Sequence, residues 1–419
     1  MKTRIDTDRS GAQDRSGPPV EQRDAGRLSV LDTIRRAGQI ARIDISRATG
    51  FSPATVTAIT AELLRAGLIE ETVPADKPAT TKRGRPRVTL KLRGASQRIA
   101  GVKVAQKALT VMILDFEGNE IAEHESPLPA FRFPAQGLAD QIVAALGGAC
   151  AKAGLRLDEL TGVGVGLAGQ VDVDQSFVHW SSSLSERNVD LGGLLARRMP
   201  CPVFLDNDAN LVAKAEHLFG EGRNFGTFLV VTLEHGVGLG VVIDGRLYRG
   251  ARGCGTEFGH AKVQLDGALC QCGQRGCLEA YVGNYALLRE FNNVSGEPML
   301  SDVTQLFDAA RDGNPLARSV LDRAGRVFAI GLANLVNIFD PQLVIVAGPN
   351  AAQHPICEEA VLNQVAALVV QVDAPNPAIR IRGWGHPMWA KGAAAYAMEQ
   401  VAALSVRDLG RVEAEAHAI

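Results

Sequence analysis

The stretch from Gly253 to Glu279 carries the most specific pattern in this sequence. It reads Gly-Cys-Gly-Thr-Glu-Phe-Gly-His260, then nine residues, then Cys270-Gln-Cys272-Gly-Gln-Arg-Gly-Cys277-Leu-Glu. One imidazole and three thiolates are ligands that Zn²⁺ takes in closed, tetrahedral structural sites. Two glycines between Cys272 and Cys277 permit the tight turn that brings both sulfurs to one ion. The pattern therefore predicts a structural zinc site of His260, Cys270, Cys272 and Cys277; the alternative is a set of unconnected cysteines in a reduced interior.

Two carboxylates, Glu257 and Glu279, flank the predicted metal ligands. A rigid metal loop would hold both where they could accept hydrogen bonds from hydroxyl groups. The order Glu-x-Gly-His followed by Cys-x-Cys-Gly-x-x-Gly-Cys-Leu-Glu resembles the signature of the ROK family (repressors, open reading frames and sugar kinases), over residues 94 to 400. The resemblance implies an α/β fold of two actin-like, ribonuclease-H-like lobes with a cleft between them. It also implies that His260 touches a sugar as well as the metal.

Charge is unevenly distributed along the 419 residues. Residues 1–93 hold 18 Lys and Arg against 11 Asp and Glu, whereas the rest holds 26 against 35. A basic first part on an acidic body favours nucleic acid binding by the first part. The sequence has no apolar run of about 20 residues, no secretory leader and no disulfide pattern. These features exclude a membrane protein and predict a cytoplasmic one.

The first 93 residues have the pattern of a DNA-binding domain. We expect residues 1–24 to be a disordered arm and residues 25–93 to form the domain, with helices from Arg27 to Gly38, at 43–49 and from Pro53 to about Ala66. Ser52 is a good cap for the last helix, and Pro53 fits its first position. Helix, glycine turn and helix indicate a helix-turn-helix. The residues expected to face DNA on this helix are Ser52, Ala54, Thr55 and Thr57.

Two short strands, at 68–70 and 88–90, enclose a basic loop and predict a wing. Arg83, Arg85 and Arg87 in this loop could reach phosphates or a minor groove. The domain resembles the winged helix-turn-helix of ROK repressors, which their kinase relatives lack. The alternative is a three-helix protein-contact module with a solvated charged linker.

Strands and helices alternate in the body, which predicts an α/β class. Strands are expected at 99–114, 120–125, 162–167, 203–205, 228–233, 240–243 and 343–347, and helices at 137–153, 211–218, 327–339 and from Pro387. The resemblance implies a small lobe at 94–210 joined by the C-terminal helix 387–419. It implies a large lobe at 211–386 that contains the metal loop.

Asn207 and Asp208 stand where a strand enters a helix. In the family such an Asn-Asp pair contacts the sugar, and in the kinases the aspartate takes the proton from the attacking hydroxyl. The alternative role for Asp208 is a helix cap. The ligand-binding residues that the resemblance implies are Asn207, Asp208, Glu257, His260 and Glu279. Trp180, Trp384 and Trp389 are interpreted as core or rim residues.

Three segments depart from the phosphate-binding loops of the family's kinases. Lys103 replaces an aspartate near magnesium, and Ala105 and Gln106 replace glycines. Glu234 and His235 replace Gly-Thr in a second loop, where a carboxylate would repel a triphosphate. Pro349 interrupts a third loop. We therefore predict no kinase activity and treat Asp208 as a vestigial base, although residual activity stays open.

The sequence thus predicts a sugar-responsive DNA-binding regulator, most simply a repressor of carbohydrate-use genes such as those for xylose or N-acetylglucosamine. Its expected partners are operator DNA, a sugar or sugar phosphate, and a second or further copies of the chain in a homodimer or homotetramer. One rival is an ATP-dependent sugar kinase with an added DNA-binding domain. Another makes the body a docking surface for a protein, as some family members have with a phosphotransferase component.

Overall fold

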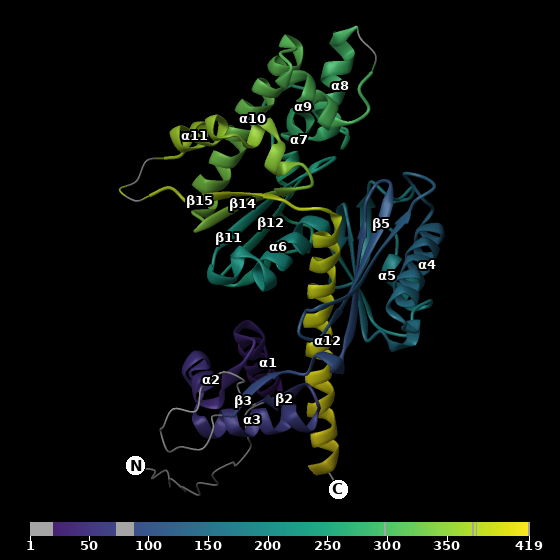
Figure 1. The fold of residues 1–419 in the computed structure, drawn as a ribbon, viewed down its shortest axis with the longest axis vertical. Helices are drawn as coiled ribbons and strands as arrows, with labels where there is room; N and C mark the ends of the chain where they lie inside the picture. The colour runs from purple at the N-terminus through teal and green to yellow at the C-terminus, as the bar shows by residue number, and fades with distance from the viewer. Residues whose placement is uncertain (1–19, 73–87, 297–298, 371–372, 374, 418–419) are drawn as a thin grey trace, which may run out of the picture. The chain divides into compact units, whose positions relative to one another are not determined.

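The computed structural model describes residues 20–72, 88–296, 299–370, 373 and 375–417 (Figure 1). The chain divides into two compact units, one of Met1–Leu92 with Ala402–Ile419 and one of Arg93–Val401. We call the first the head unit and the second the body unit. The part of the C-terminal helix from Ala402 groups with the head unit, and the part before it groups with the body unit. The reason is its length: the helix continues well beyond the small residues that pack it onto the body.

The head unit contains three helices and a small sheet. The helices are α1 (Val20–Ala37), α2 (Arg42–Thr49) and α3 (Pro53–Arg65); the strands β1 (Ile40–Ala41), β2 (Ile69–Thr72) and β3 (Thr89–Leu92) form an antiparallel sheet in the order β1-β3-β2. The core side chains are Val30, Leu31, Ile34, Ile45, Val56, Leu63 and Leu90, all fully buried. The three predicted helices are confirmed, and β2 and β3 are the strands predicted on either side of the wing. The loop 73–87 lies outside the described residues.

Helix α1 begins earlier than the sequence indicated. It starts at Val20, so residues 20–24 of the predicted arm are helical. Arg27, buried in this helix, explains the error: its guanidinium contacts Asp24 at 3.1 Å and Glu62 of α3 at 2.8 Å. A polar segment can thus be held by ion pairs rather than by apolar burial. Residues 1–19 of the predicted arm lie outside the described residues.

The body unit begins with a mixed five-stranded sheet. Its strands are β4 (Arg98–Val104), β5 (Ala108–Asp115), β6 (Glu120–Pro127), β7 (Gly162–Leu167) and β10 (Val203–Asn207), in the order β10-β7-β4-β5-β6. Strand β7 runs parallel to both β4 and β10. Helices α4 (Ala135–Ala153) and α5 (Leu191–Ala196) cover one face (Figure 1), and a hairpin of β8 (Gly169–Asp172) and β9 (Phe177–Ser181) follows β7. The carboxyl ends of β4 and β10 therefore lie at the same edge, with Lys103 next to the end of β4 and Asn207 at the end of β10.

Glycines in this sheet allow a helix to approach its other face closely. Helix α12 (His386–His417) passes Gly101 and Gly164, where a β-carbon would come within 1.9 Å of the Ala390 carbonyl and 2.0 Å of the Ala393 carbonyl. On its other side, a β-carbon at Gly392 of α12 would lie 2.0 Å from the carbonyl oxygen of Leu211. Helix and sheet are therefore packed at backbone distance, which side chains at these positions would prevent.

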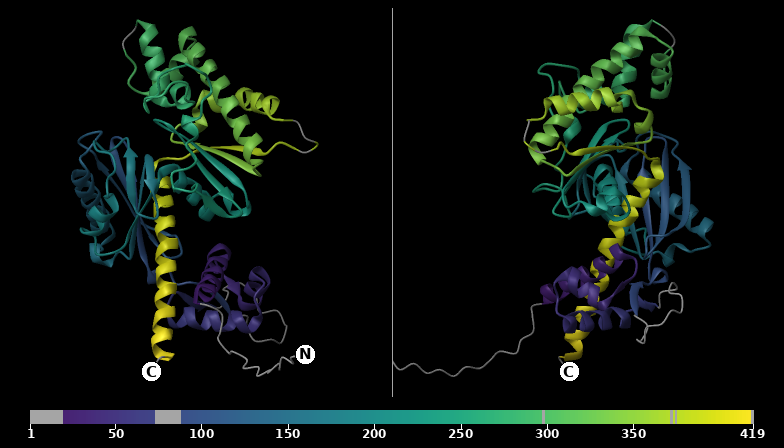
Figure 2. Two further views of the ribbon diagram at one scale, coloured as in Figure 1. Left: turned by 180° about the vertical axis from the view of Figure 1, so that it is seen from behind. Right: turned by 60° about the vertical axis from the view of Figure 1, so that its left-hand side comes forward.

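A second five-stranded sheet completes the body. Its strands are β11 (Phe228–Leu233), β12 (Val237–Ile243), β13 (Arg246–Tyr248), β14 (Leu343–Gly348) and β15 (Ala378–Gly383), in the order β13-β12-β11-β14-β15. Helix α6 (Asp208–Phe219) packs on one face. On the other lie α7 (Glu279–Val282), α8 (Asn284–Ser295), α9 (Val303–Arg311), α10 (Pro315–Phe339) and α11 (Glu359–Leu368), as Figures 1 and 2 show. Alternate residues of β11 face the two helix layers, which explains why all its residues except Thr232 are apolar.

Short 3₁₀ helices join these elements: η1 (Gly94–Ser96), η2 (Leu157–Glu159), η3 (Glu221–Asn224), η4 (Phe258–His260), η5 (Ala351–Gln353) and η6 (Pro355–Cys357). Among the helices of the described part of the chain, none has the length and apolarity needed to cross a membrane.

Candidate ligand cleft and metal centre

A cleft in the body unit brings together side chains from both sheets. Its walls include the end of β4, the junction of β10 with α6, the turn between β11 and β12, and the segments around η4 and before α7. All five predicted ligand residues line it, namely Asn207, Asp208, Glu257, His260 and Glu279. Residues separated by more than 70 positions in the sequence thus meet at one site.

The Asn207-Asp208 pair is fixed by the start of α6. The Asn207 side-chain oxygen accepts a hydrogen bond from the Ala209 amide at 2.8 Å and caps the helix, and its amide nitrogen donates to the Gly169 carbonyl at 2.9 Å. Asp208 is the first helical residue, and one of its oxygens accepts from the same Ala209 amide at 3.0 Å. Capping is therefore mainly the work of Asn207, which leaves the other oxygen of Asp208 for a different partner.

That partner is Lys103, and sequence reasoning did not foresee the contact. The Lys103 ammonium donates to Asp208 at 2.6 Å and to Glu234 at 3.2 Å, and it lies 5.3 Å from the centre of the Trp389 ring. The side chain is 2% exposed. Burial by itself would lower the pKa of Lys103, but the two carboxylates outweigh it and the pKa is raised. Lys103 is therefore a permanent cation inside the cleft wall.

A signal for this ion pair was present in the sequence but could be interpreted only with the strand order. Lys103 is the single charge among buried residues 99–104 of β4, and Asp208 follows the end of β10, one strand beyond the neighbouring β7. A lysine in an otherwise apolar strand needs an anionic partner. The candidates were several carboxylates, and only the topology selects Asp208 and Glu234.

Glu234 also connects the cleft to helix α12. Its second oxygen lies 3.5 Å from Nδ1 of His386, the first residue of that helix. The backbone amide of Glu234 donates to the Gly236 carbonyl at 3.0 Å and so closes the turn between β11 and β12. One carboxylate therefore contacts both the buried lysine and the start of α12.

Glu279 and Glu257 face the cleft from the metal loop. Glu279 accepts from the Val237 amide at 3.2 Å with one oxygen and from the Tyr285 hydroxyl at 3.3 Å with the other. Burial, together with the negative charges of Glu279 and Asp208, raises the pKa of Glu257 to about 7. Both carboxylates therefore offer acceptor oxygens to a ligand in the cleft.

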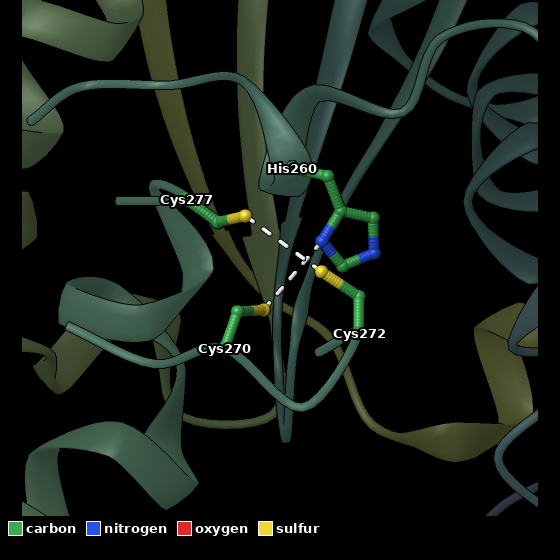
Figure 3. A group of neighbouring side chains, drawn as sticks. All are labelled: His260, Cys270, Cys272 and Cys277. Atoms are coloured by element: carbon green, nitrogen blue, oxygen red, sulfur yellow. Dashed lines mark hydrogen bonds between the residues drawn. The ribbon is translucent and has the colours of Figure 1, made fainter. Parts of the chain in front are cut away.

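The four predicted metal ligands converge, as Figure 3 shows. Their ligand atoms all lie within 4.8 Å of one another, with Cys270 Sγ 3.7 Å from His260 Nδ1 and Cys272 Sγ 3.7 Å from Cys277 Sγ. A tetrahedral zinc with Zn–S distances of about 2.3 Å sets its sulfurs roughly 3.8 Å apart. The side chains therefore fit a tetrahedral ion. The glycines predicted to form the turn, Gly273 and Gly276, have φ values of 86° and 76°.

Neighbouring side chains support the group of four. The Lys262 ammonium donates to Cys277 Sγ at 3.0 Å and to the His260 carbonyl at 3.1 Å. The Tyr285 hydroxyl lies 3.6 Å from Cys270 Sγ while it donates to Glu279. A cation beside a thiolate and a hydroxyl between thiolate and carboxylate are the outer contacts that orient metal ligands. Tyr285 thus connects the metal loop to a cleft carboxylate.

A second buried charge pair, also unforeseen, stands behind the cleft. Arg249 directs Nε and Nη2 to one oxygen of Asp206, at 2.9 and 2.6 Å, and its guanidinium lies 5.2 Å from the Tyr396 ring centre on α12. Asp206 is fully buried, and its other oxygen accepts from Asn210 and from the Asn207 amide. The pair therefore ties the second sheet to the residue that precedes the Asn207-Asp208 pair.

The predicted DNA-facing residues of the head lie at the start of α3. Ser52, Ala54, Thr55 and Thr57 are exposed, whereas Val56 is buried. Ser52 caps the helix as predicted, since its hydroxyl accepts from the Thr55 amide at 3.1 Å. The wing arginines Arg83, Arg85 and Arg87 lie outside the described residues.

Comparison with known proteins agrees with both halves of this description. The ROK family profile matches residues 99–400, and a profile described as winged helix-turn-helix DNA-binding matches residues 24–70. The DNA-binding transcriptional dual regulator NagC of Escherichia coli (strain K12) is 30% identical over 327 residues, which are 76% of this chain and 79% of that protein.

Two solved structures show the same architecture. A ROK family transcriptional regulator described as a homolog of the E. coli MLC protein has a TM-score of 0.77 at 25% identity and covers 94% of this chain and 99% of its own. A ROK family glucokinase from Streptomyces griseus, in complex with glucose and AMPPNP, has a TM-score of 0.63 at 28% identity and covers 72% of this chain and 99% of its own. The α/β fold with a winged helix-turn-helix and a two-lobed, actin-like body is confirmed.

Proposed function

Because this chain belongs to the ROK family, we propose that it is a sugar-responsive DNA-binding transcriptional regulator, most simply a repressor of carbohydrate-use genes. The head unit binds operator DNA, and the body cleft binds the sugar. The hydroxyls of a sugar donate hydrogen bonds to Asn207, Asp208, Glu257 and Glu279, with His260 beside them. These groups are mostly acceptors, which suits a ligand rich in hydroxyl donors.

The observation that carries the proposal against an enzyme is the pairing of Lys103 with Asp208. A catalytic base needs a free lone pair and a poised pKa. Here a buried ammonium is bonded to Asp208 at 2.6 Å and to Glu234 at 3.2 Å. These contacts hold the carboxylate in place as a fixed anchor and occupy the oxygen that a base would offer to a hydroxyl. Asp208 is thus a sugar contact rather than a base.

The positions of the phosphate loops support the same conclusion. Phosphoryl transfer depends on positioning and on neutralising the phosphate charge. Lys103 stands where the kinases of the family have an aspartate near magnesium, and Glu234 places a carboxylate in the second loop. Both changes act against Mg²⁺ and a triphosphate together.

We assign the group His260, Cys270, Cys272 and Cys277 to Zn²⁺, which supplies structural cross-linking when bound. The protein's own contribution is to keep Glu257 and Glu279 in place, through the short helix η4 and the hydroxyl of Tyr285. In this role the zinc ion stabilises the loop and takes no part in a reaction at the cleft.

DNA recognition is assigned to the exposed start of α3, with Arg83, Arg85 and Arg87 of the wing on phosphates or in a minor groove. A two-fold symmetric assembly, dimer or tetramer, would match a palindromic operator. Sugar binding changes operator affinity to the extent that the sugar prefers one of two states of the protein.

The test combines gel shifts on the DNA upstream of the chain's own gene with a panel of monosaccharides. We expect a shift with the protein alone and a change in affinity with one sugar. Thr57→Glu, which places a negative charge at the exposed start of α3, should abolish the shift by repelling phosphates. Gln39→Glu makes the same charge change at another exposed position of the head and should have little effect. An unchanged shift with Thr57→Glu would remove α3 from the interface.

The kinase alternative is favoured by Asp208 itself and by the similarity to a glucokinase. ADP release on mixing the protein with ATP, Mg²⁺ and the sugar panel, at an ordinary enzymatic rate, would establish it. The docking alternative predicts instead that no sugar alters operator binding while a phosphotransferase protein removes it.

A further inference from the structure

The charge of the cleft restricts which form of sugar it can accept. Four carboxylates line it: Asp208, Glu234, Glu257 and Glu279. Among the described residues of the cleft lining, Lys103 is the one with a permanent positive charge. Together these five side chains carry three net negative charges when all are ionised.

Lys103 is not available to bind an additional anion. Its ammonium has three donors, and two of them are used by Asp208 at 2.6 Å and Glu234 at 3.2 Å. The Trp389 ring lies 5.3 Å away and the side chain is 2% exposed. The third donor lies in this nearly closed environment, so an incoming phosphate would meet an ammonium that two carboxylates already share.

Three backbone amides in the segments that line the cleft are also engaged. The Val237 amide in the second loop donates to Glu279 at 3.2 Å, and the Ala209 amide at the start of α6 donates to Asn207 at 2.8 Å. In the first loop, the Ala105 amide donates to the Ala108 carbonyl at 3.1 Å. Anion sites in proteins usually depend on such amides being free. These three amides instead donate to acceptors of the protein itself.

We propose that the cleft selects an unphosphorylated sugar and rejects the phosphate ester of the same sugar. A phosphate monoester brings nearly two negative charges and three acceptor oxygens, and both add to what the cleft already has in excess. A free sugar brings hydroxyl donors, which the carboxylates can accept. This inference rests on the proposed function, because it assumes that the cleft is the inducer site.

The experiment is calorimetric titration of the full-length, zinc-loaded protein with glucose, N-acetylglucosamine and xylose, each compared with its phosphate ester. We expect at least one free sugar to bind, and to bind at least tenfold more tightly than its ester. In Glu234→Gln, Lys103 keeps one charged partner and the cleft loses one negative charge, so the ratio should narrow at least threefold. Glu359→Gln, an exposed residue of α11, removes the same charge outside the cleft and should leave the ratio unchanged.

The results of these titrations distinguish a failure of this inference from a failure of the proposed function. An ester that binds more tightly than its free sugar overturns the inference and leaves the proposed function standing. A ratio that is unaltered by Glu234→Gln in a variant with unchanged melting temperature also overturns it, since the selectivity would then come from elsewhere. If neither sugars nor esters bind or alter operator binding, the proposed function fails, and the inference with it.

Discussion

The cleft holds its carboxylates in place by two different means. On one side Glu257 and Glu279 belong to the loop of His260 and Cys270, whose ligands lie close together in the sequence. On the other side Asp208 and Glu234 are held by Lys103, which is 105 and 131 residues away from them in the chain. The first arrangement is local and could be inferred from residue spacing. The second depends on the strand order of two sheets and became visible only in the fold.

The largest effect should come from breaking the local arrangement. Cys272→Ser removes one of four ligands, so zinc content should fall from about one ion per chain to a small fraction, and melting should fall by roughly 10 °C or more. Atomic absorption and differential scanning calorimetry measure both. Cys254→Ser, a cysteine outside the group of four, is the control. A metal content equal to that of the wild type would refute the ligand assignment.

The Arg249–Asp206 pair allows a measurement of how much stability is lost when a buried carboxylate loses its cationic partner. Arg249→Met leaves the fully buried Asp206 carboxylate with only neutral hydrogen-bond donors, and we expect a loss of about 3 kcal/mol. Chemical denaturation followed by fluorescence measures it. Adding Asp206→Asn to the same chain should restore part of the loss, whereas Arg252→Met, on an exposed residue of the same loop, should change little. A double variant no better than the single one would argue against a charge effect.

Removal of the Lys103 contacts in the cleft should lower the free energy of unfolding by a somewhat smaller amount. Lys103→Met leaves Asp208 and Glu234 facing each other, but they are 15% and 26% exposed, so water can reach them. We expect a loss of roughly 2 kcal/mol, measured by denaturation, with zinc content unchanged. Loss of zinc in this variant would show that the two arrangements are coupled rather than independent.

The smallest expected change in stability comes from Glu216, and it should depend on pH. It lies on α6 like Asp208, but burial raises its pKa to about 7, and within the described part of the chain its Oε1 has no hydrogen-bond partner. Since the folded pKa lies above the unfolded one, its favourable contribution is complete below about pH 4.5 and is lost as pH rises towards 7. Glu216→Gln should therefore raise the melting temperature by a few degrees at pH 8 and hardly at pH 5. A gain of equal size at both pH values would exclude titration as the cause.

Elements of the fold could likewise be predicted where the local sequence determines them and were missed where packing of distant segments does. Strands β7 and β11 begin and end where the apolar runs predicted them, because both faces are covered and Thr232 is the one polar residue in the two strands. Strand β15 was missed, since Ile379 and Ile381 alternate with Arg380 and Arg382 in an edge strand. Helices α7 to α9 and α11 were missed too, because their identity depends on packing over the second sheet.

For the site, sequence could predict residue identities but not charge pairing. Motifs and the resemblance to a family indicated which residues meet in the group of four and in the cleft, and their roles there stay predictions. Lys103 was recognised only as a departure from a phosphate loop, since nothing near it in the chain shows which carboxylate it meets. Asp206 and Arg249 were missed altogether, as neither belongs to a motif.

The close crossing of α12 over α6 at Gly392 has a consequence for how the cleft can open. Helix α12 is seated on the first sheet and α6 on the second, and they meet where a β-carbon on residue 392 would lie 2.0 Å from the Leu211 carbonyl oxygen. Lys214 of α6 also pairs with Glu399 of α12 at 2.8 Å, so the two helices cannot separate at this crossing without losing that ion pair. A methyl group at position 392 would push the two helix backbones apart, and with them the two sheets that line the cleft.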